Sequence, residues 1–155
     1  MNIRAFAILV ILGVGAIVSA FAQETSAVFR PIVLWGDNVS KGVLLISPTE
    51  MLIVDSKGDK CGKVVAKEAI YGAYISLDGE KLAYTTANGL WLAKIKNGEN
   101  YLVASGYLDF FRWNSDGLGF LFSMDERGKD APSSISNIKF FWADGDGKNI
   151  KQVYP

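Results

Sequence analysis

A chain of 155 residues is long enough for one domain with its own hydrophobic core. Its sixteen basic and sixteen acidic residues cancel, and no basic cluster stands out, which argues against nucleic acid as a partner. The absence of histidine excludes serine–histidine–aspartate and cysteine–histidine nucleophile systems and the usual catalytic zinc sites. The single cysteine, Cys61, can form neither an internal disulfide nor a thiolate metal site, and we expect no cofactor.

The first 22 residues have the pattern of a cleavable export signal. Arg4 supplies a positive charge, an uncharged apolar run follows from 5 to 18, and small residues precede an expected cut after Ala22. The alternative is an uncleaved N-terminal membrane anchor, although an apolar run of about 18 residues is marginal for the ~20 that cross a bilayer. We therefore expect a periplasmic or secreted protein, with no membrane association once the signal is removed.

The rest of the chain is typical of short strands separated by turns, with no amphipathic helix pattern of useful length. Three units of four strands are predicted, at 30–35, 42–47, 51–55 and 63–66, then at 69–76, 81–86, 90–96 and 101–104, and finally at 109–114, 119–123, 138–142 and 149–154. Within the second unit, Asn97-Gly98 indicates a type I′ hairpin turn.

The predicted turns recur at a nearly constant spacing. The first-turn aspartates are Asp37, Asp78 and Asp116, which lie 41 and 38 residues apart. The second-turn glycines are Gly58, Gly98 and Gly147, which lie 40 and 49 residues apart because the third unit contains an extra polar segment at 124–134. Four strands in about 40 residues is typical of one β-propeller blade.

The residues of the repeat resemble a known family. Ser76-Leu77-Asp78-Gly79 with Ala83-Tyr84, then Gly89-Leu90-Trp91-Leu92 and Asn97-Gly98, is similar to the WD-like repeat of TolB-type propellers. The segments 113–117 and 146–153 follow the same pattern, whereas Leu77 stands where that family usually has proline. The resemblance implies an all-β partial propeller of about three four-stranded antiparallel blades, at 28–66, 69–104 and 109–154.

A closed propeller needs at least four blades, and this chain has room for about three. An open arc leaves the apolar faces of its end blades bare, which a soluble monomer rarely tolerates. Either two copies complete a ring, or a protein partner covers the ends, or the sequence is part of a longer propeller. We favour a truncated or degenerate short propeller over a dimeric ring, and we expect a protein partner or self-association.

The acidic residues are interpreted as structural. Most aspartates lie beside glycine or asparagine in predicted turns, where a carboxylate caps its own backbone instead of acting as a catalytic acid. The segment 144–149 faintly resembles a calcium loop, but it lacks glycine at its sixth position and its twelfth would be Pro155 and not an acidic residue. We therefore predict no metal site and no catalytic residue.

Two features are candidates for binding. The aromatic runs 110–113 and 140–142 alternate between sheet faces, so Phe140 and Phe141 cannot share one, and we interpret these runs as core between blades. The turns between second and third strands and between units should emerge at one end of the fold, where loops often carry recognition. The candidate binding residues are Glu50, Asn88, Tyr107, Asp125, Glu126, Arg127, Lys129 and Asp130.

The sequence thus predicts an exported, non-enzymatic, β-propeller-type module that mediates protein–protein interaction. One alternative is a propeller fragment associated with a prolyl-oligopeptidase-like peptidase, which a downstream Gly-x-Ser-x-Gly motif would favour. Another is a small carbohydrate-binding β domain, which would expose a row of aromatic side chains.

Overall fold

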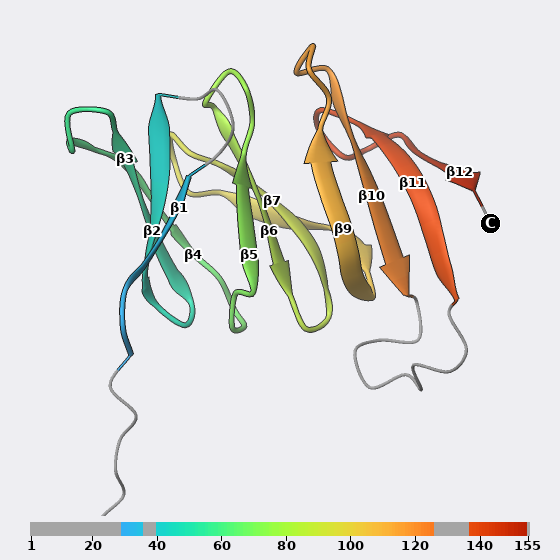
Figure 1. Ribbon diagram of the computed structural model, residues 1–155, viewed down its shortest axis with the longest axis horizontal. Coiled ribbons are helices and arrows are strands. Elements are labelled where there is room, and N and C mark those ends of the chain that lie inside the picture. The colour runs from blue at the N-terminus through green and yellow to red at the C-terminus, as the bar shows by residue number, and fades with distance from the viewer. Residues whose placement is uncertain (1–28, 36–39, 126–136, 155) are drawn as a thin grey trace, which may run out of the picture.

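The chain is built from strands in the part that the computed structural model describes, which is residues 29–35, 40–125 and 137–154. Twelve strands in these ranges form three four-stranded antiparallel sheets, which Figure 1 shows side by side in chain order. This confirms the all-β prediction of about three four-stranded units. The expected export signal lies outside the described residues. No helix in the described part is long and apolar enough to cross a membrane.

Each sheet is an up-and-down meander of four consecutive strands. The first sheet contains β1 (Ile32–Trp35), β2 (Lys41–Ser47), β3 (Glu50–Asp55) and β4 (Lys60–Val65). The second contains β5 (Gly72–Ile75), β6 (Lys81–Thr86), β7 (Gly89–Lys94) and β8 (Asn100–Ser105). The third contains β9 (Tyr107–Trp113), β10 (Gly119–Asp125), β11 (Ile138–Asp144) and β12 (Ile150–Tyr154).

The hairpin turns depend on glycine in the left-handed region of backbone space. Gly58, Gly79, Gly117 and Gly147 have φ between 64° and 88°, and each donates its amide to the carbonyl three residues earlier. Only glycine adopts this φ without a steric penalty. These are the turns whose spacing predicts the repeat, although Asp37 lies outside the described residues.

The predicted type I′ turn at Asn97-Gly98 is wrong in detail. β7 ends at Lys94 and β8 begins at Asn100, so the connection is longer than the two residues of such a turn. The cause is Ile95, whose amide donates to the carbonyl of Glu80 at 2.9 Å and whose side chain is buried in the core. Gly98 closes the longer turn by donating its amide to the Lys94 carbonyl at 2.8 Å.

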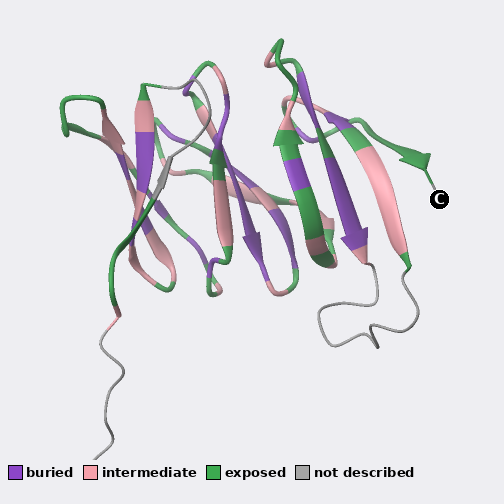
Figure 2. Cartoon of the chain, viewed as in Figure 1, coloured by how far each residue is buried: buried purple, intermediate pink, exposed green. Residues whose placement is uncertain are grey.

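Two hydrophobic cores lie between the three sheets. The core between the first and second sheets contains Val43, Leu45, Met51, Ile53, Val64, Ala66, Ile70, Ile75, Leu82, Tyr84, Ala93 and Ile95. The core between the second and third contains Ala83, Leu90, Leu92, Phe111, Phe120, Phe122, Met124 and Ala143. Successive residues of β6 alternate between these cores, so the middle sheet is covered on both faces, and Figure 2 shows β6 buried along most of its length.

The two faces of each sheet need separate names. We call the face turned toward the next sheet along the chain the leading face, and the opposite one the trailing face. At the first junction, Val43 on the leading face lies in one core with Tyr84 on the trailing face of the second sheet. At the second junction, Ala83 on the leading face lies in one core with Phe122 on the trailing face of the third sheet. Within the described residues, no sheet covers the leading face of β9–β12 or the trailing face of β1–β4.

Polar contacts also join successive sheets. Lys41 donates to the carbonyl of Gly79 at 2.8 Å across the first junction. Lys81, which also begins the second strand of its sheet, donates at 2.7 Å to Asp146 across the second junction. The tryptophan Nε1 of Trp113 donates to the carbonyl of Tyr74 at 3.0 Å. Each junction is therefore fixed in register by hydrogen bonds as well as by apolar packing.

The Lys81–Asp146 pair predicts a small pH dependence of stability. The ammonium of Lys81, by its hydrogen bond and its charge, holds the pKa of Asp146 below the ordinary 3.8. A carboxyl with a lowered folded pKa stabilises the fold above its unfolded pKa, and this contribution is lost as pH falls through the folded value. Because the pair is largely exposed, we expect Asp146→Asn to cost at most about 1 kcal/mol at pH 7.

Thermal unfolding of the wild type and Asp146→Asn from pH 7 to pH 2 measures this contribution. The difference in midpoint temperature should be largest at neutral pH and should shrink below pH 3.8. The matched control is Asp109→Asn, on the exposed part of β9. A difference that stays constant across the whole range would show that the carboxylate of Asp146 contributes nothing through its charge.

Candidate binding surface

The leading face of the third sheet is largely apolar, and no sheet within the described residues covers it. The strand register places Arg112, Leu121, Trp142 and Lys151 in one row across all four strands. The next row on the same face contains Phe110, Ser123, Phe140 and Tyr154, of which Ser123 is fully buried. We call these eight residues the open leading face.

Large apolar side chains on the open leading face are partly exposed. Phe110 is 41%, Leu121 37%, Trp142 39% and Tyr154 64% exposed, although all but Tyr154 lie within the body of a strand. Figure 2 shows β9 exposed along much of its length, with a buried band in its middle where Phe111 enters the core. An exposed apolar patch on a sheet face is a mark of an interaction surface, because folding alone would select polar residues there.

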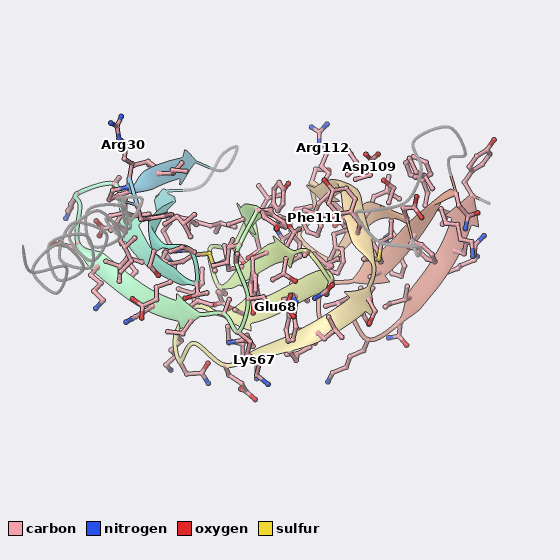
Figure 3. All side chains as sticks on the ribbon, turned by 90° about the horizontal axis from the view of Figure 1, so that it is seen from below. Arg30, Lys67, Glu68, Asp109, Phe111 and Arg112 are labelled. Atoms are coloured by element: carbon pink, nitrogen blue, oxygen red, sulfur yellow. The ribbon has the colours of Figure 1, made fainter. Side chains whose placement is uncertain are left out.

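The open leading face contains a shallow hollow of about 450 Å³. Its walls are formed by Phe110, Arg112, Trp113, Asn114, Ser115, Leu121 and Trp142. The guanidinium of Arg112 extends away from the sheets, whereas Phe111 lies between them and stacks on Tyr74 with ring centroids 4.9 Å apart (Figure 3). The hollow therefore combines apolar walls with a cation at its edge.

The aromatic runs divide between this surface and the core. Phe111 and Phe141 pack in the second core, as interpreted from the sequence, and Phe122 stacks on Phe141 at 5.3 Å. Phe110 and Trp142, from the same runs, are exposed instead. The prediction that Phe140 and Phe141 occupy opposite faces is confirmed. The sequence signal for an exposed aromatic face is that neighbouring aromatic residues of one strand point to opposite faces of the sheet. The sequence does not indicate which of the two faces is covered.

The predicted loop residues are only partly described. Glu126, Arg127, Lys129 and Asp130 lie outside the described residues. Figure 1 shows that the β2–β3, β6–β7 and β8–β9 connections emerge at one end of the fold, as expected. There the amide of Gly106, next to Tyr107, donates to the carbonyl of Asn88 at 3.0 Å. Tyr107 is paired with Asp125 across β9 and β10.

Glu50 is the predicted binding residue of the first sheet, at the start of β3. It forms an ion pair with Lys63 at 3.2 Å on the trailing face of the first sheet. Asn88 donates its side-chain amide to Glu68 at 3.1 Å, at the start of the second sheet. The described candidates thus spread over three sheets and do not converge on one pocket.

The aspartates of the turns are occupied by the backbone. The carboxylates of Asp55, Asp78 and Asp116 each accept a hydrogen bond from the amide two residues later. Asp144 accepts from the amide of Lys148, and this bond holds the pKa of Asp144 below its ordinary value. The interpretation of Asp78, Asp116 and Asp144 as turn residues is therefore confirmed, and Asp55, at the end of its predicted strand, has the same role. No group of three potential metal ligands occurs among the described residues.

No protein-family model and no curated protein matches the chain, but solved structures do. It aligns over 76% of its length with the β-propeller domain of Myceliophteria thermophila Cps50 (Swd1), at a TM-score of 0.55 and 10% identity. It aligns over 79% with Pyrococcus horikoshii acylaminoacyl peptidase, at a TM-score of 0.56 and 16% identity. The fold is a partial β-propeller. Its three sheets are blades, and the chain spans 39% and 24% of those two proteins.

A third similar structure is that of Saccharomyces cerevisiae Dbp5 bound to Nup159 and Gle1, at a TM-score of 0.50 and 11% identity. The match covers 78% of this chain and 32% of that chain. Likeness at these identities concerns the fold alone. In a closed propeller every blade has a neighbour on both faces, so the open leading face is where a propeller would continue.

Proposed function

We propose that this chain is an exported, non-enzymatic propeller module of the TolB-like type, which binds protein through the open leading face. The observation that carries the proposal is the exposure of Phe110, Leu121 and Trp142 on a strand face of the kind that packs against another sheet at both internal junctions. Apolar surface of this extent on a folded domain is stabilised when a partner removes it from water.

The composition of the surface supports a protein partner. Tryptophan, tyrosine and arginine are the residues that contribute most to protein–protein affinity, and the open leading face contains Trp142, Tyr154 and Arg112. Leu121, Phe140 and Trp142 lie on the two central strands, and Arg112 and Lys151 lie on the two edge strands. An apolar centre with a charged rim is the usual anatomy of such an interface.

Export and the absence of catalysis rest on the sequence. The TolB-like repeat and the N-terminal pattern support a periplasmic or secreted location. The described turn aspartates are engaged by backbone amides, which supports a binding role over acid–base chemistry. The likeness to Swd1 and to a Dbp5 complex is at the level of fold and is compatible with a protein partner. The TM-score with the peptidase is similar to that with Swd1, so it does not favour association with a peptidase over binding of another protein.

One observation favours a second candidate, a carbohydrate ligand. The rings of Phe110 and Trp142 flank a hollow that also contains Asn114 and Ser115, and aromatic rings beside polar groups are a common way to hold a small ligand. A sugar would fill the hollow but would leave Tyr154 and the rest of the open leading face in water. The protein partner therefore explains more of the exposed apolar surface.

The experiment that tests the proposal places a photo-cross-linking residue, p-benzoylphenylalanine, at position 121 in a bacterial cell that exports the chain. The matched control carries it at position 118, because Leu118 is 73% exposed in the β9–β10 turn and is not among the residues that form the hollow. We expect several-fold more protein adduct from position 121 than from position 118. The mass of the exported chain should correspond to a protein that starts at Gln23. Equal adduct from both positions, or loss of adduct on adding soluble oligosaccharides, would overturn the protein-binding proposal.

A further inference from the structure

We propose that the partner of the open leading face is the trailing face of the first blade in a second copy of this chain, so that two copies close a six-bladed ring. This inference rests on the proposed function, because it names the protein that the module binds. It differs from the expectation of a truncated propeller, and it is argued from the residues that the strand register places on the two open faces.

Residues at corresponding positions of the blades compare the junctions directly. On leading faces, the paired residues of the second and third strands are Val43 with Ile53, Ala83 with Leu92, and Leu121 with Trp142. On trailing faces, the corresponding pairs are Leu44 with Leu52, Tyr84 with Trp91, and Phe122 with Phe141. No described sheet covers two of these pairs: Leu121 with Trp142 on the leading face of the third blade, and Leu44 with Leu52 on the trailing face of the first blade.

Both internal junctions pack an aliphatic leading pair against an aromatic trailing pair. Val43 and Ile53 share a core with Tyr84 and Trp91, and Ala83 and Leu92 share one with Phe122 and Phe141. At the open ends this arrangement is reversed, since the leading pair contains Trp142 and the trailing pair, Leu44 with Leu52, is aliphatic. Each junction, including one between the two open faces, then has one aromatic and one aliphatic side.

This reversal selects the partner. A protein interior must be filled at nearly constant density, so adding side-chain volume to one side of a junction requires removing it from the other. An ordinary trailing face with an aromatic pair would be overpacked against Leu121 and Trp142. Two open leading faces placed against each other would have the same fault. The trailing face of the first blade has the smaller side chains of Leu44 and Leu52 at the positions where the other two blades have aromatic rings, so it can accept Trp142 with the least overpacking.

The area of the faces favours a closed ring over an open chain of copies. Four strands about 4.8 Å apart and six residues at about 3.4 Å each give a face of about 400 Å². One new junction would bury about 800 Å² in total, which is no more than a typical crystal contact. A ring of two copies forms two new junctions and buries about 1,600 Å², the size of a stable specific interface. It also gives a six-bladed propeller, within the range of four to eight blades in which rings close.

The test is the molar mass of the chain purified after export, measured by light scattering during size-exclusion chromatography. We expect a mass twice that of one chain. Leu121→Lys on the leading face and Leu52→Glu on the trailing face should each halve it, because each places a charge in both junctions of the ring. Mixing the two variants should restore the doubled mass, since one junction is then unchanged and the other joins lysine to glutamate.

Leu118→Glu, at an exposed turn position, is the matched control and should leave the mass doubled. Circular dichroism of each variant confirms that a halved mass reflects dissociation and not unfolding. A dimer that survives Leu52→Glu but not Leu121→Lys would overturn the ring, because two leading faces would then be in contact. A wild-type chain with the mass of one copy at 100 μM would overturn the second copy as partner. The protein-binding proposal would then stand or fall separately on whether the adduct at position 121 contains a different protein.

Discussion

Phe122→Ala is expected to lower the free energy of unfolding by about 3–5 kcal/mol. Phe122 is fully buried on the trailing face of the third blade. Its ring stacks on that of Phe141, and its centroid lies 5.8 Å from the centroid of the Phe120 ring. Truncation to alanine removes the ring from the core between two blades, and rigid strands on both sides prevent the space from closing. Because domains of this size are stable by only 5–15 kcal/mol, much of the stability would be lost.

Urea unfolding followed by tryptophan fluorescence measures this change. The matched control is Leu118→Ala, which truncates a residue of the same blade that is 73% exposed, and it should change the free energy by less than about 0.5 kcal/mol. If Phe122→Ala were no more destabilising than this control, the third blade would not be packed on the second as described.

Tyr84→Ala is expected to cost a similar amount, about 3–5 kcal/mol, at the other junction. Tyr84 is 1% exposed, and its ring stacks on Trp91 with centroids 6.1 Å apart. Its hydroxyl donates to the side-chain oxygen of Asn100 at 3.0 Å, and Asn100 in turn donates to the carbonyl of Val65 on the first blade at 3.2 Å. Burial raises the pKa of Tyr84 to about 12, so the hydroxyl keeps its proton and remains a donor at physiological pH.

Tyr84→Phe separates the ring from the hydroxyl. It retains the packed ring and removes one hydrogen bond, so we expect a loss of about 1 kcal/mol in the same urea measurement. The difference between the two variants then reports the apolar packing between the first and second blades. Equal losses for Tyr84→Ala and Tyr84→Phe would mean that the hydroxyl alone carries the stabilisation, and the stacked-blade account of this junction would be wrong.

Much of the fold could be predicted from local sequence because the turns are local structures. The turns require a left-handed residue, which Gly79 and Gly117 supply wherever the rest of the chain lies, and Asp78 and Asp116 cap their own turns. Alternation within the strands then gives the two faces of each blade. The type I′ prediction at Asn97-Gly98 is wrong because Ile95 packs in the core against the first blade, and no local sequence pattern indicates that contact.

The candidate surface was harder to predict because it depends on what each face meets. Leu121 and Phe122 are equally apolar, and only the number and order of blades decides that Phe122 is covered and Leu121 is open. Contacts between blades, such as Lys81 with Asp146, join residues 65 positions apart and have no local signature. Loop position correctly indicated which connections share an end of the fold, but not that its described members lie on three different blades.

The measurement that tests the central claim most directly is hydroxyl-radical footprinting of the chain, diluted until it has the mass of one copy, read at neighbouring aromatic residues. The account predicts that Phe110 and Trp142 are oxidised readily, while Phe111, Phe120 and Phe122 are protected, because adjacent residues face opposite sides of one blade. Equal oxidation within the pair of Phe110 and Phe111, or protection of Trp142 with oxidation of Phe122, would contradict three stacked blades with one open aromatic face.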